Sequence, residues 1–411
     1  AFASQINRPV HIGRLRTYLL PGRFLIEDLV IEGLMPEDRP FFQSERIVIS
    51  TSWLPLLRGE FLVTDVDMQG WRMLVENSAD ERHSFPRVVG QSADDELPRQ
   101  PTNATPGEPV ADRPEGNERR FVTTVQYLRA HDGEFIYEDH GTPWSVVARN
   151  IDLTLTKRVA YGGQVSFSDG TVRIADFEPM TADMEALYAL DGGQVNLPRI
   201  DLRLDGFESV VTGAVDLLNW PEQTYEIVTS TIDLPTMKDV FFADDEFSVT
   251  GDATFQGLWH LFDGGRELTG SFASGNSVLN GLDFPSLDGD LIWTRDRFEI
   301  TRARSNFYGG NLDFTFSMQP LGTPIPGIGT FDTSWAAVDL DPLFETLEIR
   351  GARPEGYASG RNLLQWPLGQ GDQLSGDGQV IVSPEAGIPL LPRGVRPSSG
   401  RSGWAYAGWV L

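Results

Sequence analysis

The stretch Leu312-Asp313-Phe314-Thr315-Phe316-Ser317-Met318 alternates between apolar and polar side chains. Because successive side chains of a β-strand point to opposite faces, this alternation predicts a strand with one apolar face and one wet face. Ile151-Asp152-Leu153-Thr154-Leu155 and Ile200-Asp201-Leu202-Arg203-Leu204 repeat the pattern. A period of two continues almost throughout residues 121–382, which indicates an all-β chain.

Working outward, strands are also predicted at Phe24–Glu32, Arg46–Ser52 and Glu60–Gln69. The 42 glycines stand mostly in Gly-Gly, Asp-Gly and Gly-Asp pairs between strands, where tight hairpin turns need positive φ. Helix signals are few. Only Pro235–Phe242 and Pro342–Leu347 combine a proline at a first helical position with an acidic, partly apolar turn.

The sequence around these two short helices repeats. Ile232-Asp233-Leu234 matches Val338-Asp339-Leu340, an offset of 338 − 232 = 106 residues, and Trp259 matches Trp366 at a similar offset. A unit of several strands and one helix, present twice, is typical of a chain that extends a sheet by repetition. We therefore expect an elongated, curled, repetitive antiparallel β-sheet, a β-groove, with a few short helices.

Composition divides the chain into four parts. Residues 1–76 form an N-terminal strand-rich module, and the acidic, proline-rich residues 77–120 are predicted to be a disordered linker. Residues 121–382 form the repetitive β-groove domain with its two related units, and residues 383–411 an irregular C-terminal tail. No apolar stretch is long enough to span a bilayer. The sequence starts at Ala1, so we expect that a preceding membrane segment is missing from it.

The charge and the missing cysteines exclude several kinds of function. With 33 basic and 59 acidic side chains the net charge is −26, which makes nucleic acid an unlikely partner. Without cysteine the chain has no disulfide, thiolate zinc site, iron–sulfur cluster or cysteine nucleophile. No HExxH, GxSxG, Walker A or helix-opening GxGxxG motif occurs, so we expect no enzyme activity, cofactor or metal.

Two groups of polar residues are candidate sites. His131 and His140 flank a predicted strand at opposite ends, too far apart to share a metal without a fold-back. Acidic pairs such as Asp288 with Asp290 and Asp339 with Asp341, and the run Asp244-Asp245-Glu246, could serve as glycosidase carboxylates or calcium ligands. Because acidic residues are so frequent in this chain, we interpret them as turn residues and a solvated face.

The apolar strand faces point to a ligand. A curled sheet with one apolar face forms a long trough, and leaving it to water would cost about 25 cal/mol per Å². We expect phospholipid acyl chains to fill it and to touch the following inward residues: Leu153, Leu155, Ile200, Leu202, Leu204, Leu312, Phe314 and Phe316. The alternative is a structural scaffold or adhesin of closed β-sandwiches without lipid. A β-helix polysaccharide enzyme ranks last, because its coils repeat every 20 to 30 residues.

Several short motifs resemble AsmA-like and TamB-like proteins of Gram-negative envelopes. They include Pro9-Val10-His11-Ile12-Gly13, Leu19-Leu20-Pro21-Gly22-Arg23-Phe24 and Trp53-Leu54-Pro55-Leu56-Leu57-Arg58-Gly59-Glu60. Phe307-Tyr308-Gly309-Gly310 and the Val338-Asp339-Leu340 helix followed by Gly356 extend the resemblance, which covers roughly residues 9–75 and 121–382.

The resemblance implies a periplasmic body anchored in the inner membrane by an N-terminal helix that this sequence lacks. It also implies phospholipid transport between membranes or support of outer-membrane assembly, with an outer-membrane protein as a candidate partner. The family has no catalytic residues to carry over. The chain departs from the family in its long acidic, proline-rich insertion and in the loss of strand alternation after Ser383.

Overall fold

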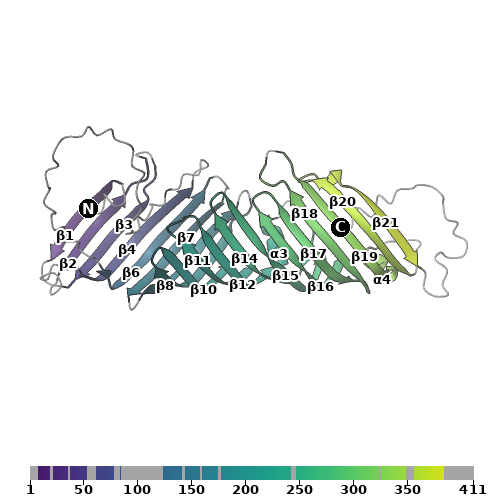
Figure 1. Ribbon diagram of the computed structural model, residues 1–411, viewed down its shortest axis with the longest axis horizontal. Helices are drawn as coiled ribbons and strands as arrows, with labels where there is room; N and C mark the ends of the chain where they lie inside the picture. Colours follow the sequence, from purple (N-terminus) through teal and green to yellow (C-terminus); the bar gives the residue numbers. More distant parts are fainter. Residues whose placement is uncertain are drawn as a thin grey trace, which may run out of the picture.

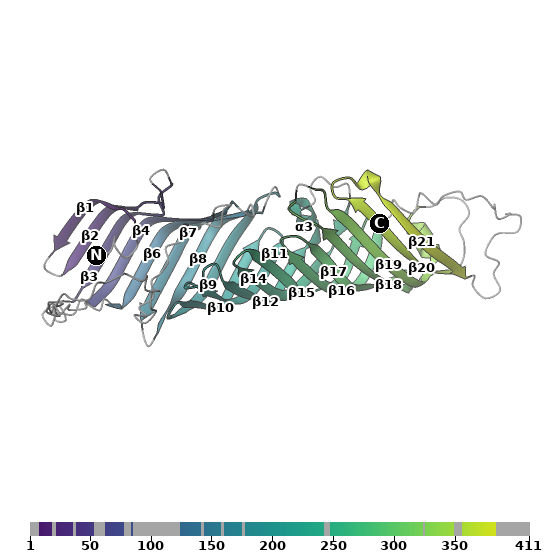
Figure 2. The ribbon, with the colours of Figure 1, turned by 45° about the horizontal axis from the view of Figure 1, so that its top comes forward.

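The computed structural model shows one elongated, curled β-sheet (Figures 1 and 2). It describes residues 8–18, 22–35, 38–52, 62–77, 84, 124–140, 144–157, 160–174, 177–241, 247–323, 325–348 and 356–383. Within these residues 21 strands belong to a single sheet that does not close into a barrel, as the alternating sequence predicted. The tail after Ser383 and most of the predicted linker lie outside the described residues.

In the described ranges the strands follow one another along the chain, with two α-helices and one 3-10 helix between them. Their bounds are β1 Val10–Tyr18, β2 Arg23–Ile31, β3 Phe42–Thr51, β4 Leu62–Asn77, β5 Thr124–Val125, β6 Tyr127–Asp139, β7 Trp144–Lys157, β8 Tyr161–Ile174, β9 Met180–Asp191, β10 Gln194–Leu204, β11 Phe207–Asp216, β12 Gln223–Asp233, α3 Leu234–Phe241, β13 Val249–Thr250, β14 Asp252–Phe262, β15 Gly265–Leu279, β16 Leu282–Thr294, β17 Phe298–Phe307, β18 Gly310–Gln319, β19 Ile328–Asp339, α4 Leu340–Thr346, β20 Tyr357–Pro367, η1 Gly371–Gln373 and β21 Ser375–Ser383.

Each long strand pairs antiparallel with the next long strand along the chain, except at one place, and the two-residue strand β13 pairs antiparallel with β15. β4 runs parallel to β5 and β6, in a register that places Met68 opposite Ala130 and Val75 opposite Tyr137. Parallel neighbours need a long connection, and the stretch between β4 and β5 contains the predicted linker. The sheet therefore departs from the antiparallel expectation at this place, and it runs unbroken past residues 77–120.

The predicted elements appear where the sequence placed them. β2, β3 and β4 overlap the three predicted strands. The predicted ends Glu32 and Ser52 fall one residue beyond β2 and β3, the predicted start Glu60 lies outside the described residues, and β4 extends eight residues beyond Gln69 to Asn77. Both predicted helices form, as α3 and α4, and each starts one or two residues before its proline. Asp339 caps α4 by accepting a hydrogen bond from the Asp341 amide, and Asp233 accepts one from the Thr236 amide at the start of α3.

The two helices occupy equivalent places in the sheet. α3 connects β12 to β13 and β14, and α4 connects the antiparallel neighbours β19 and β20. The first amide of each helix donates to a glycine carbonyl, Leu234 to Gly251 at 3.1 Å and Leu340 to Gly356 at 3.0 Å. Both glycines have positive φ, 105° and 129°. The local geometry thus repeats together with the sequence motif.

Candidate functional site: the inner face of the sheet

A row of apolar residues and glycines crosses the whole sheet. Each residue of the row is paired with the next one on the neighbouring strand. Cross-strand partners point to the same face, so the pairings can be followed from strand to strand. Nineteen strands contribute one residue each, all but the two-residue strands β5 and β13 (21 − 2 = 19). We call the face that carries this row the inner face. The row consists of Leu15, Ile26, Ile47, Met68, Ala130, Leu153, Val165, Ala186, Ile200, Val211, Ile227, Gly257, Gly270, Leu291, Ile300, Phe316, Phe331, Leu364 and Gly376.

The eight residues predicted to touch acyl chains all lie on the inner face. Leu153, Ile200 and Phe316 belong to the row itself, and the other five follow at even spacing on the same three strands. Ile200 and Leu312 are buried, with 7% and 3% of their surface exposed, and the other six are half-buried. The structure thus brings the predicted residues to one surface, while their contact with lipid stays a prediction.

Aromatic side chains become dense on the inner face toward the C-terminal end. The Phe316 ring stacks on Trp366 and meets Phe298 edge-on, with ring centroids 6.1 Å apart in both pairs. The Phe314 and Phe331 rings lie 5.3 Å apart. The lining therefore changes from mostly aliphatic in β7–β11 to strongly aromatic in β14–β20.

Three tryptophan rings lie over glycines of a neighbouring strand. A Cβ built on Gly133 would come within 2.2 Å of the Trp71 indole, and one on Gly329 within 2.6 Å of Trp366. Gly360 stands in the same relation to Trp335. Because real Cβ atoms do not come this close, each ring occupies the space that a side chain would fill. The spacing of apolar residues gave no signal for these pairings.

The two long edges of the sheet meet near its middle. Trp220, in the turn between β11 and β12, packs against the cluster of Ile31, Phe41, Val75 and Tyr137 on the opposite edge. Arg266 stands at the turn between β14 and β15, on the same edge as Trp220. Burial lowers the pKa of Arg266, and the charge of Asp139 on the opposite edge partly offsets this effect. Side chains of the two long edges therefore meet in this section, a contact that no local pattern could reveal.

A cavity of about 510 Å³ opens beside the turn between β10 and β11. Its apolar wall includes Leu204, Phe207 and Ile232, which pair across β10, β11 and β12 on the inner face. Its polar wall includes Asp205 and Asp233 at the edge of the sheet. One predicted contact residue, Leu204, thus faces a space that a ligand could enter.

The outer face carries acidic residues, several of them beside arginines. Arg304 Nε lies 3.0 Å from an Asp288 carboxylate oxygen, Arg302 pairs with Asp290, and Arg361 Nη2 lies 2.7 Å from Asp332. These side chains are largely exposed, as expected of a solvated face.

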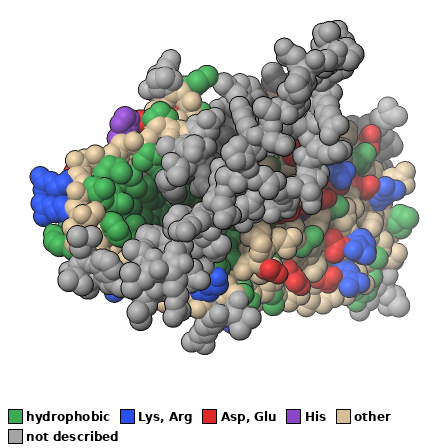
Figure 3. All heavy atoms as spheres, turned by 60° about the vertical axis from the view of Figure 1, so that its left-hand side comes forward, with side chains coloured by type: hydrophobic (Ala, Val, Ile, Leu, Met, Phe, Trp, Pro, Cys, Tyr) green, Lys and Arg blue, Asp and Glu red, His purple; other side chains and the backbone are tan. Residues whose placement is uncertain are grey.

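In Figure 3 the N-terminal end comes forward, and hydrophobic side chains line a hollow with basic residues at its margin. The run Asp244-Asp245-Glu246 lies outside the described residues.

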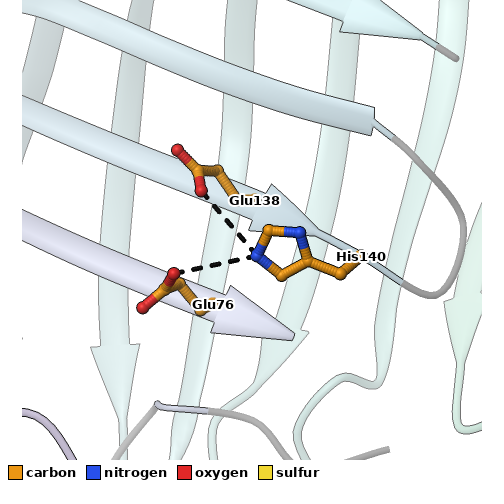
Figure 4. A group of neighbouring side chains, drawn as sticks. All are labelled: Glu76, Glu138 and His140. Atoms are coloured by element: carbon orange, nitrogen blue, oxygen red, sulfur yellow. Dashed lines mark ion pairs between the residues drawn. The ribbon is translucent and has the colours of Figure 1, made fainter. Parts of the chain in front are cut away.

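The acidic groups nearest to a metal-site geometry are Glu76, Glu138 and His140 (Figure 4), whose ligand atoms lie within 4.8 Å of one another. Arg39 already pairs with both carboxylates, at 2.5 Å to Glu76 and more closely to Glu138. Its guanidinium lowers the pKa of Glu138. This arrangement is a surface ion-pair cluster around an arginine, since a cation would compete with Arg39 for the same oxygens.

His131 and His140 lie apart, as the sequence indicated. His131 Nδ1 is 3.0 Å from Asp132 and lies toward the middle of β6, whereas His140 follows the end of that strand. Nine residues of extended strand separate them by roughly 30 Å. The two histidines cannot share a metal ion.

Comparison with known proteins identifies no relative: no family model, curated protein or solved structure matches this chain. None of the helices in the described ranges has the length and apolar character needed to cross a membrane. The resemblance to AsmA-like and TamB-like proteins stays a prediction.

Proposed function

We propose that the protein is a non-enzymatic lipid conduit whose inner face holds the acyl chains of phospholipids. The observation that carries this proposal is the unbroken row from Leu15 to Gly376. An ordinary sheet core needs an apolar face only where another layer packs on it. Here the row continues across every long strand, and all described strands belong to one sheet.

The cost of hydrating such a face favours an apolar ligand. Six of the eight predicted contact residues remain half-buried with no second sheet among the described strands to cover them. Each methylene of a lipid chain placed there gains about 0.8 kcal/mol by leaving water. An extended acyl chain fits a continuous strip, whereas a compact ligand would use only a few strands of it.

We propose that this conduit moves phospholipid between two membranes. The proposed setting is the periplasm, where the transport would support outer-membrane assembly. An elongated shape suits it, because the inner face runs along the whole length of the sheet (Figure 2). The scaffold alternative would need closed sandwiches of two facing sheets, whereas the described strands form one sheet, which favours the conduit.

The test is extraction of bound lipid from the purified protein, followed by transfer of fluorescent phospholipid between donor and acceptor vesicles. Wild-type protein should carry phospholipid and accelerate transfer. A charge placed on the inner face should abolish both, while the same substitution on the outer face should not. Protein that carries no lipid and leaves transfer at the spontaneous rate refutes the proposal.

A further inference from the structure

We propose that the outer face of β1–β3 is a docking surface for an anionic phospholipid bilayer. Four arginines define this surface, which we call the basic patch: Arg14, Arg16, Arg23 and Arg46. The pairing register places them on one face, since Arg14 lies opposite Glu27, Arg16 opposite Leu25, Arg23 opposite Tyr18, and Glu27 opposite Arg46. The inference deepens the proposed function, because it names the surface from which lipid would enter.

The charge of the basic patch is opposite to that of the protein as a whole. The chain carries −26, yet on β1–β3 the four patch arginines share their face with one acid, Glu27, for a net +3, and the next acids on that face, Asp65 and Asp67, stand on β4. Glu27 is shared between Arg14 at 3.5 Å and Arg16 at 3.9 Å. Within the part of the chain that the structure describes, Arg23 and Arg46 form no ion pair, and both are exposed. Their charge is therefore available to an anionic surface.

The spaces between the arginines are apolar, which favours a bilayer over other anionic surfaces. A cavity of about 250 Å³ is lined by Tyr18, Arg23, Leu25, Arg46 and Val48. Tyr18 is 46% exposed. Tyrosine and arginine together suit the lipid–water interface, where the ring enters the headgroup layer and the guanidinium binds phosphate.

The inner face of the edge strand β1 also favours a bilayer as the partner. Leu15, the row residue on the opposite side of β1, is 56% exposed, unlike the row residues Ala186 and Ile200 in the middle of the sheet. β1 pairs only with β2, so this end of the described sheet is open. A bilayer that contacts the basic patch would therefore lie next to the exposed start of the apolar row.

The experiment is binding of the purified chain to vesicles, measured by flotation. Vesicles of phosphatidylcholine with about one third phosphatidylglycerol are compared with vesicles of phosphatidylcholine alone, at low and at high salt. The variant Arg16→Gln/Arg23→Gln/Arg46→Gln removes three patch charges. The matched control Arg302→Gln/Arg304→Gln/Arg361→Gln removes three outer-face charges toward the other end of the sheet. Circular dichroism and thermal unfolding verify that both variants fold.

We expect binding only to the anionic vesicles, weakened by salt. Each arginine near an anionic surface contributes about fivefold in affinity, so the patch variant should bind on the order of a hundredfold more weakly, and the control like wild type. Equal loss in both variants, or no binding by wild type, overturns the inference. Lipid found in the groove of a protein that does not bind vesicles refutes the docking surface alone, whereas vesicle binding by a protein without groove lipid refutes the conduit alone.

Discussion

Replacing Leu202 with aspartate should reduce the amount of lipid held in the groove without unfolding the protein. Leu202 is half-buried on β10, opposite Met184 of β9 and Ser209 of β11. Burying a whole leucine contributes about 1.5–3 kcal/mol, so losing a half-buried one should lower the free energy of unfolding by about 1 kcal/mol. A carboxylate inside an apolar lipid layer costs about 3 kcal/mol more, which lowers lipid affinity at this strand on the order of a hundredfold.

The assay is the amount of phospholipid extracted per chain, together with the rate of transfer between vesicles. Leu187→Asp is the matched control, because Leu187 lies on the adjacent strand β9, is 45% exposed and faces outward opposite Gln164 and Arg199. The control should retain lipid at the wild-type level. Equal lipid in both variants, with both folded, would show that the inner face at β10 does not contact acyl chains.

Three further predictions follow from the packing and the charges. Gly133→Ala should lower the free energy of unfolding by about 1–3 kcal/mol, because its methyl group would overlap the buried Trp71 ring; urea unfolding followed by tryptophan fluorescence measures this, and an unchanged midpoint contradicts it. Trp220→Ala should loosen the contact between the two long edges and speed amide exchange in β6 and β7, whereas exchange in β17 and β18 should stay unchanged. Arg39 lowers the pKa of Glu138 below its ordinary 4.5, so the stability from this pair is complete above that pH and is lost as the pH falls through the lower, folded-state pKa. The urea midpoint of wild type should therefore drop more on acidification than that of Arg39→Met, and parallel pH profiles would refute the assignment.

The strand pattern made most of the fold predictable. Alternation such as Leu312-Asp313-Phe314 specifies both a strand and the face it buries, so the sequence places the eight predicted contact residues on one face, although it names only three residues of the row. The two helices were found because a proline and a capping aspartate, Asp233 or Asp339, are local signals.

Other features depend on contacts between residues distant in sequence. Nothing near β4 indicates that it pairs parallel with β6, because this depends on the length and path of the connection between them. The packing of Trp220 against the cluster that contains Val75 arises from the accumulated twist of many strands. The basic patch was missed for a similar reason: its arginines are spread over β1, β2 and β3, and only the register brings them together.

The most direct test of the lipid conduit is native mass spectrometry of the purified chain, with extraction and identification of whatever it releases. The unbroken apolar row predicts phospholipid at several copies per chain, lost on delipidation and regained from vesicles. A single, lipid-free mass that does not change after incubation with vesicles would contradict the central claim.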